Sequence, residues 1–312
     1  MGGDFSPKAV LEGIFAFEDQ YPNLVVEGIK LDLVLFGLKK EIDELCQNYQ
    51  RDLTKHSFIQ ASEVITMEDS PVKALVEKKQ STIVMGMSFL AQQKIDAFAS
   101  AGNTGAMLAG GFKIIGSVQG VIRPSLVGLI PKMDGSTNLL LDVGANTDCR
   151  ADVLAQFARL GSIYAQYVMN IPEPKVGLLS IGEEDGKGTL VVKETNKLLR
   201  EDTRIHFIGN IEGRDLYAGA QDVTVCDGFV GNIALKQTES FYHILQSKKL
   251  DQQDPYFERF NFENYGGATI LGLKAPVVIA HGISTPKAIV NMILFSAKIA
   301  KAKIPQMIAE VF

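Results

Sequence analysis

The stretch Leu139–Thr147, LLLDVGANT, decides the fold. Its apolar part, Leu139–Val143, has the length of a buried strand and is too short for a helix. Glycine and asparagine follow it, and apolar residues then return at helical spacing over Val153–Met169. Strand, polar turn and helix in this order make one βα unit, which predicts an α/β protein.

The same unit recurs along the chain. Strands are also predicted at Leu31–Phe36, Ala97–Ser100, Leu126–Ile130, Lys175–Ser180, Arg204–Ile208, Asp222–Cys226 and Pro276–Ala280. Helices are predicted at Gly105–Ile115, Thr189–Leu199, Asn232–Gln246 and Thr285–Ala302, and helix starts at Ser6-Pro7 and Ser70-Pro71. Strands that alternate with helices predict a mainly parallel sheet.

Composition excludes several classes of protein. With 312 residues, 46% of them hydrophobic and 21% charged, the chain can bury a large core, in one α/β domain or two closely joined ones. The net charge of −5 gives no global basic field for nucleic acid. Three cysteines without CxxC spacing argue against zinc and disulfides and favour a cytoplasmic protein, and no apolar run approaches the length of a membrane span.

Glycine and asparagine mark the carboxyl ends of five predicted strands, where ligands collect in open α/β sheets. The five loops are AGNTGA (101–106), DVGANT (142–147), IGEEDGKGT (181–189), GNIEGRD (209–215) and DGFVGN (227–232). One such loop is more often a plain tight turn. Five of them, each before a helix, favour a ligand that bears phosphate, because helix N-termini and close backbone approach suit an anion.

Lys187 is the most informative cation, because it lies between two glycines in one of these loops. A loop lysine is usually a solvated charge, but a compact ammonium among anion-binding loops holds phosphate well. His281 ends a strand, yet a lone histidine is more often structural. No HExxH, GxSxG or Walker A motif is present, and no cofactor is predicted. Inorganic phosphate can itself attack a thioester, which leaves Lys187, Asn232 and backbone N–H groups to hold it and to stabilise the oxyanion.

At these loops the sequence resembles the PlsX family of phosphate:acyl-carrier-protein acyltransferases. The motifs that carry the resemblance are MGGDFSPKA (1–9), SAGNTGA (100–106), LDVGAN (141–146) with Asp148-Cys149, and IGEEDGKG (181–188). GNIEGRD (209–215), CDGFVGN (226–232), YGGA (265–268) and AHGIS (280–284) extend it in the same order over nearly the whole chain.

The resemblance implies a three-layer αβα fold like that of isocitrate and isopropylmalate dehydrogenases, with a cleft between two lobes and a homodimer. It implies transfer of a fatty acyl group from acyl carrier protein to inorganic phosphate, for phospholipid synthesis in the cytoplasm at the inner membrane face. The family has a strand before its MGGD motif, so a core strand is expected to lie outside this sequence. It also has an apolar helical tip where residues 242–264 here form a mostly polar excursion, which we expect to be a shortened or incomplete helical tip.

The residues expected to act follow from the loops and the resemblance together. Lys187 and Asn232 are the predicted catalytic pair. The predicted contacts to phosphate or substrate are Asn103, Thr104, Gly105, Asp142, Asn146, Gly186, Asp227, Gly228 and His281. No metal ligands are predicted.

Three other functions compete with this one. A short-chain phosphotransacetylase that uses coenzyme A thioesters has nearly the same chemistry. A non-catalytic scaffold for carrier protein or lipid would not need Lys187 and Asn232. An oxidoreductase is disfavoured, because no GxGxxG follows a strand and no aspartate cluster suggests a metal-bound hydroxyacid.

Overall fold

The structure is a computed structural model that describes residues 1–250 and 254–312. The chain divides into two compact units, which are described separately. Unit 1 comprises Met1–Gly116 and Phe262–Lys301, and unit 2 comprises Ser117–Asn261 and Ala302–Phe312.

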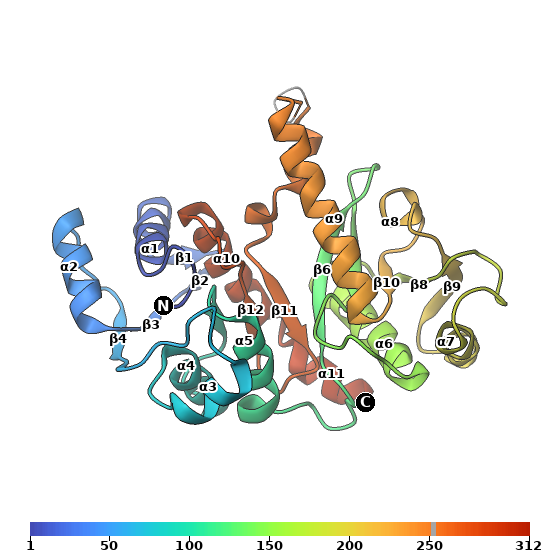
Figure 1. The fold of residues 1–312 in the computed structure, drawn as a ribbon, viewed down its shortest axis with the longest axis horizontal. Helices are drawn as coiled ribbons and strands as arrows, with labels where there is room; N and C mark the ends of the chain where they lie inside the picture. Colours follow the sequence, from blue (N-terminus) through green and yellow to red (C-terminus); the bar gives the residue numbers. More distant parts are fainter. Residues whose placement is uncertain (251–253) are drawn as a thin grey trace. The chain divides into compact units, whose positions relative to one another are not determined.

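Unit 1 combines a short sheet with helices (Figure 1). Its strands are β1 (Val25–Val26), β2 (Ile29–Lys30), β3 (Val34–Gly37), β4 (Ser57–Gln60), β5 (Phe98–Ser100), β11 (Ala268–Leu271) and β12 (Val277–Ile279). Its helices are α1 (Lys8–Gln20), α2 (Lys39–Tyr49), α3 (Pro71–Glu77), α4 (Thr82–Ala91), α5 (Thr104–Gly110), a π-helical turn (Gly111–Ile115), a 3₁₀ turn (Phe262–Tyr265) and α10 (Pro286–Ala302).

The strands of unit 1 run in the order β5-β12-β11. β12 is parallel to β5, with Ile279 opposite Ser100, and antiparallel to β11. β3 and β4 form a separate parallel pair, and β1 and β2 a hairpin. The core lies between α1, α10 and these strands, and Phe17 and Ile289 are among its fully buried side chains.

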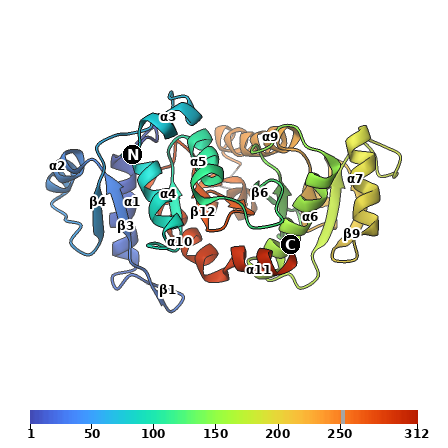
Figure 2. The same ribbon diagram turned by 90° about the horizontal axis from the view of Figure 1, so that it is seen from below.

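Unit 2 holds the larger sheet. Its strands are β6 (Ser125–Pro131), β7 (Thr137–Leu141), β8 (Lys175–Leu179), β9 (His206–Ile211) and β10 (Val223–Val225), in the order β6-β7-β10-β8-β9. Its helices are α6 (Ala151–Tyr167), α7 (Leu190–Glu201), α8 (Asp215–Ala218), α9 (Gly228–Ser247), a 3₁₀ turn (Pro255–Phe260) and α11 (Ile304–Val311). α6 packs on β7, β10 and β8, and α9 packs on β6 and β7. Figure 2 shows α9 and α11 on opposite sides of β6.

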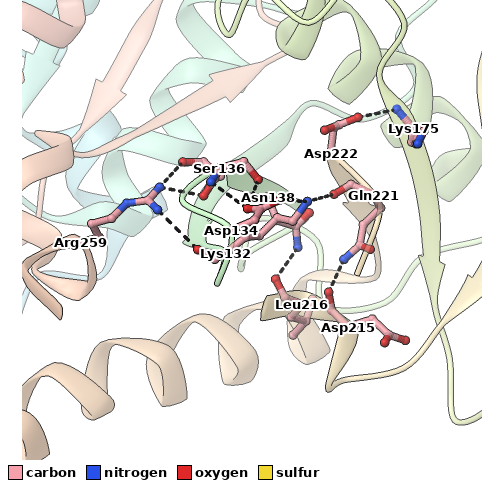
Figure 3. A network of polar contacts seen from close by, with 11 residues as sticks. Lys132, Asp134, Ser136, Asn138, Lys175, Asp215, Leu216, Gln221, Asp222 and Arg259 are labelled. Carbon is pink, nitrogen blue, oxygen red and sulfur yellow. Dashed lines mark hydrogen bonds and ion pairs between the residues drawn. The ribbon is translucent and has the colours of Figure 1, made fainter. Parts of the chain in front are cut away.

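A polar network fixes the amino ends of β7, β8 and β10 (Figure 3). The buried Lys132 ammonium donates to the Gln221 carbonyl at 3.2 Å, and the Asn138 amide donates to the Leu216 carbonyl at 3.2 Å. Arg259 donates to the Ser136 carbonyl at 2.7 Å. Lys132 and Arg259 are therefore bound to the chain itself, at the edge of the sheet opposite to the predicted ligand loops.

The predicted α/β class is confirmed, because β7, β10, β8 and β9 are all parallel. β6, by contrast, pairs antiparallel with β7. The strands β1, β2, β4 and β11 were not predicted. In the expected polar excursion, α9 runs on to Ser247 and a 3₁₀ turn follows at Pro255–Phe260, while residues 251–253 lie outside the described residues. Within the described ranges, no helix is both long and apolar enough to cross a membrane.

Candidate functional site

One edge of the unit 2 sheet collects most of the predicted residues. The carboxyl ends of β7, β10 and β8 share this edge because the three strands are parallel neighbours. The amino end of β6 also lies there, because β6 is antiparallel to β7 and places Val127 opposite Leu141. From β6 to β8, the loops of this edge carry Arg123, the 142–147 turn, the 227–232 turn and Lys187.

Asp142 is fully buried at the end of β7, with no exposed surface. Its Oδ1 accepts from the Leu126 and Ala145 backbone N–H groups at 2.9 and 3.2 Å. Its Oδ2 accepts from the backbone and side-chain N–H groups of Asn146 at 2.6 and 2.9 Å. Burial raises the pKa of Asp142, and these hydrogen bonds oppose the rise. Four donors from the chain already surround the carboxylate, so Asp142 shapes the turn and presents no open face to a ligand.

Asn146 is also buried, at 7% exposed, and its side chain donates to the Pro124 carbonyl at 2.8 Å as well as to Asp142. It therefore ties the 142–147 turn to the start of β6. The Gly228 N–H donates to the Asn146 carbonyl at 2.7 Å, which joins the next turn to the same frame.

The 227–232 turn opens α9. Asp227 caps this helix, because its Oδ1 accepts from the Val230 N–H at 2.9 Å. A Cβ at Gly228 would meet the Asp142 carboxylate at 2.8 Å, and a Cβ at Gly231 would meet the Asp142 carbonyl oxygen at 1.9 Å. Glycine at both positions lets α9 start directly against the Asp142 turn, which places Asn232 beside it.

Asn232 is exposed near the start of α9, as its fifth residue. Its carboxamide lies over Gly144, where a Cβ would come within 3.5 Å of the Asn232 Oδ1. Gly144 has φ +122°, a conformation that favours glycine. Among the described residues the Asn232 carboxamide has no hydrogen-bond partner, so a neutral donor and acceptor lies next to a backbone turn that a small ligand can approach closely.

Lys187 is exposed in the loop between β8 and α7, as is Gly186. Its aliphatic stem passes over Gly182, where a Cβ would meet the Lys187 Cγ at 2.9 Å. Two acidic residues of this loop have other partners, since Asp185 pairs with Arg200 and Glu183 with Arg214. The exposed Glu184 carboxylate lies near Gly182, where an added Cβ would be 2.9 Å from its Oε2. Among the described residues, no carboxylate lies within ion-pair distance of the Lys187 ammonium, so its charge is available to a ligand.

The remaining predicted residues lie in unit 1. Asn103 is buried and caps α5 by accepting from the Ala106 N–H at 2.9 Å, while its amide donates to the Thr66 and Asp69 carbonyls. Thr104 is exposed on the first turn of α5. Gly105 packs so closely on Pro71 that a Cβ would come within 2.5 Å. Asn103 and Gly105 therefore hold the loop in place by contacts within unit 1.

His281 follows β12, next to the loop that follows β5. Its ring packs on Phe262 with centroids 5.1 Å apart, and its carbonyl accepts from the Ser284 hydroxyl at 2.6 Å. The MGGD segment meets the same edge, because the Asp4 N–H donates to the Gly282 carbonyl at 2.9 Å. Unit 1 thus brings the motifs of residues 1–9, 100–106 and 280–284 together.

A cavity of about 630 Å³ lies inside unit 1. Its lining is mainly apolar, from α1, β3, β5 and α10, and includes Leu35, Phe98 and Met292. None of the predicted site residues lines it. In the described part of the chain, no three His, Cys, Asp or Glu residues are grouped as metal ligands.

Arg123 is the residue of this edge that the sequence analysis missed. It lies two residues before β6, is exposed, and donates through Nη1 to the Asp148 carbonyl at 2.9 Å. Only the antiparallel direction of β6 brings it to the ligand edge. To predict that direction from the sequence, Asp134-Gly135 would have to be recognised as a hairpin turn between two apolar runs.

One family model and several relatives match nearly the whole chain. The family model described as "Fatty acid synthesis protein" matches residues 1–307. A phosphate acyltransferase of Chlorobaculum tepidum is 39% identical over 335 residues, covering 99% of both chains. One of Dictyoglomus thermophilum is 37% identical, covering 99% of this chain and 95% of the relative.

Solved structures share the fold at low identity. A phosphotransacetylase from Streptococcus pyogenes matches with a TM-score of 0.67 at 17% identity, over 95% of this chain and 92% of its own. A 4-hydroxythreonine-4-phosphate dehydrogenase from Klebsiella pneumoniae matches with a TM-score of 0.56 at 10% identity, over 94% and 95%. Such likeness shows the fold alone, whereas the family model and the full-length relatives show descent: the chain belongs to the fatty acid synthesis protein family, the PlsX phosphate acyltransferases.

Proposed function

We propose that this chain transfers a fatty acyl group from acyl carrier protein to inorganic phosphate. An oxygen of hydrogen phosphate attacks the thioester carbonyl carbon, and the carbonyl oxygen becomes an oxyanion. The C–S bond then breaks, and the proton of the phosphate goes to the departing thiolate. The products are acyl phosphate and the carrier thiol, so no oxidant, reductant or further reactant is needed.

The observation that supports this proposal most is the exposed Lys187 ammonium. Among the described residues no carboxylate lies within ion-pair distance of it, and Asn232, exposed on the helix that follows the neighbouring strand β10, lies along the same edge. Asp142, Asn146 and Gly228 act by fixing the turns on which Asn232 is held. An ammonium and preorganised N–H donors stabilise phosphate and a developing oxyanion without acid–base catalysis by a side chain.

The test replaces Lys187 by alanine and measures phosphate-dependent acyl transfer. Loss of an electrostatic contact in the transition state costs about 2–4 kcal/mol, so turnover should fall by well over tenfold. Lys197→Ala is the matched control, because Lys197 is an exposed lysine of the following helix, α7. A folded Lys187→Ala protein with near-normal turnover would refute the role of Lys187.

A phosphotransacetylase that uses coenzyme A thioesters is the second candidate, favoured by the fold shared with the Streptococcus pyogenes phosphotransacetylase. Supplying long-chain acyl carrier protein and short-chain acyl coenzyme A separately decides between the two. The first function requires kcat/KM to be higher with the carrier thioester.

We also propose that the protein is a homodimer and that it works in the cytoplasm at the inner membrane face. Apolar side chains line one side of α9, with Ile233 51% and Ile244 56% exposed, and Phe241 lies between them. Such a stripe on a helix is typical of a partner contact. Sedimentation of the wild type and of Ile244→Glu tests the dimer, since a charge inside the contact should yield monomers.

A further inference from the structure

Arg123 is held next to the turn at Asp142 by hydrogen bonds that join the start of β6 to that turn. Val143 donates its backbone N–H to the Leu126 carbonyl at 3.0 Å, and Asn146 donates its side-chain N–H to the Pro124 carbonyl at 2.8 Å. Arg123 itself donates to the Asp148 carbonyl, two residues beyond Asn146. It is therefore fixed at the β6 side of this edge, next to the turn that holds Gly144.

Arg123 differs from the other arginines in what its guanidinium binds. Ion pairs with carboxylates engage Arg51, Arg150, Arg159, Arg200, Arg204 and Arg214. Arg259 donates to the backbone of the β6–β7 hairpin. Within the described ranges, Arg123 has no carboxylate at ion-pair distance, and its single hydrogen bond uses Nη1 alone. Its Nε and Nη2 groups remain as donors for a ligand.

The carboxylates nearest to Arg123 do not neutralise it. Asp142 accepts four hydrogen bonds from Leu126, Ala145 and Asn146, and Asp227 caps α9. Burial raises the pKa of the Cys149 thiol to about 12; the charges of Asp142 and Asp227 add to the rise, and that of Arg123 opposes it. The Arg123 guanidinium and the Asp142 and Asp227 carboxylates therefore all lie close enough to the Cys149 thiol to affect its pKa.

We propose that Arg123 is a second ligand of the acceptor phosphate, which it binds from the β6 side of the edge while Lys187 binds from the β8 side. This rests on the function proposed above. Neighbouring strands lie about 4.8 Å apart, so β6 and β8 are separated by roughly 14 Å, with the Asn232 carboxamide between them. A planar guanidinium with two open donors matches phosphate oxygens.

The test compares Arg123→Gln and Arg123→Lys with Arg150→Gln. Arg150 is a matched control, because it is exposed near the same turn but already paired with Asp152. We expect Arg123→Gln to raise the KM for phosphate by roughly tenfold to a hundredfold, the range for hydrogen bonds to charged groups, with kcat and the KM for acyl carrier protein little changed. Arg123→Lys should recover part of the loss, because the charge is kept.

Two readings would overturn the proposal. One is a KM for phosphate that is the same in Arg123→Gln as in the wild type. The other is a rise in the KM for the carrier protein instead, which would make Arg123 part of a docking surface for that acidic partner.

Phosphate binding without turnover separates this proposal from the proposed function. Phosphate should raise the melting temperature of the wild type and of Arg150→Gln, and raise that of Arg123→Gln much less. If the wild type binds phosphate in this way but transfers no acyl group, the proposed function fails and Arg123 stands as a phosphate ligand. If the wild type shows no such shift, or Arg123→Gln shows the full shift, Arg123 is not a ligand.

Discussion

Replacing Gly231 by alanine should destabilise unit 2 through one collision. The added Cβ would lie 1.9 Å from the Asp142 carbonyl oxygen and 2.9 Å from the Cys226 sulfur. Both atoms belong to buried residues at the ends of β7 and β10, so they cannot move aside freely. Either α9 must shift away from the sheet by more than an ångström or the turn at Asp142 must distort. Overpacking of this kind costs about 3 kcal/mol.

For a unit of this size, that cost corresponds to a fall in melting temperature of roughly 6–12 °C. Circular dichroism during heating measures it, with Gly186→Ala as the control. A Cβ added at Gly186 would meet no atom within 4 Å, so this substitution should change stability by no more than about 0.5 kcal/mol. Equal melting temperatures for the two variants would refute the claim that Gly231 sets the distance between α9 and the Asp142 turn.

Two further predictions concern titratable groups. Burial alone would raise the pKa of Asp202, but hydrogen bonds from Arg204 and Arg159 hold it below its ordinary value. The ionised carboxylate therefore stabilises the folded state fully above about pH 4, and this stabilisation is lost as the pH falls through the depressed pKa. Asp202→Asn should therefore lower the melting temperature at pH 7 more than at pH 3, and an equal loss at both would contradict the ion pairs. A thiol reagent at pH 8 should modify the half-buried Cys46 well before the buried Cys149, whose pKa burial raises to about 12; equal rates would show that Cys149 is open to solvent.

The βα units could be predicted because each strand is a short apolar run that ends in glycine or asparagine. Strand direction could not be predicted in the same way. Leu126–Ile130 was expected as a strand, but its apolar residues are the same whether it runs parallel or antiparallel to its neighbour. The antiparallel pairing depends on the turn at Asp134-Gly135, where Gly135 has φ +86°.

For the predicted site residues, the sequence indicated which strand each one follows, but not which groups its side chain contacts. Asn103 and Asp227 both cap helices, and Asp142 accepts hydrogen bonds from its own turn. Asparagine and aspartate after a strand are favoured equally by helix capping and by ligand binding, so the residue type cannot separate the two roles. Lys187 was predicted to be catalytic because a lysine between glycines has no such structural role, and its role stays a prediction.

The same hydrogen bonds explain how an edge rich in carboxylates would accommodate the proposed phosphate. Asp142 accepts four hydrogen bonds from its own turn, Asp227 accepts one from the start of α9, and Asp185 and Glu183 pair with arginines. The exposed Glu184 has no side-chain partner among the described residues. Lys187 and Arg123 have no carboxylate at ion-pair distance among the described residues. Removing the Asp142 carboxylate would therefore free backbone donors and disturb the turn under Asn232, rather than simply relieve repulsion of phosphate. Asp142→Asn should accordingly weaken phosphate binding even though it removes a negative charge, and tighter binding by that variant would show that repulsion outweighs the positioning of the turn.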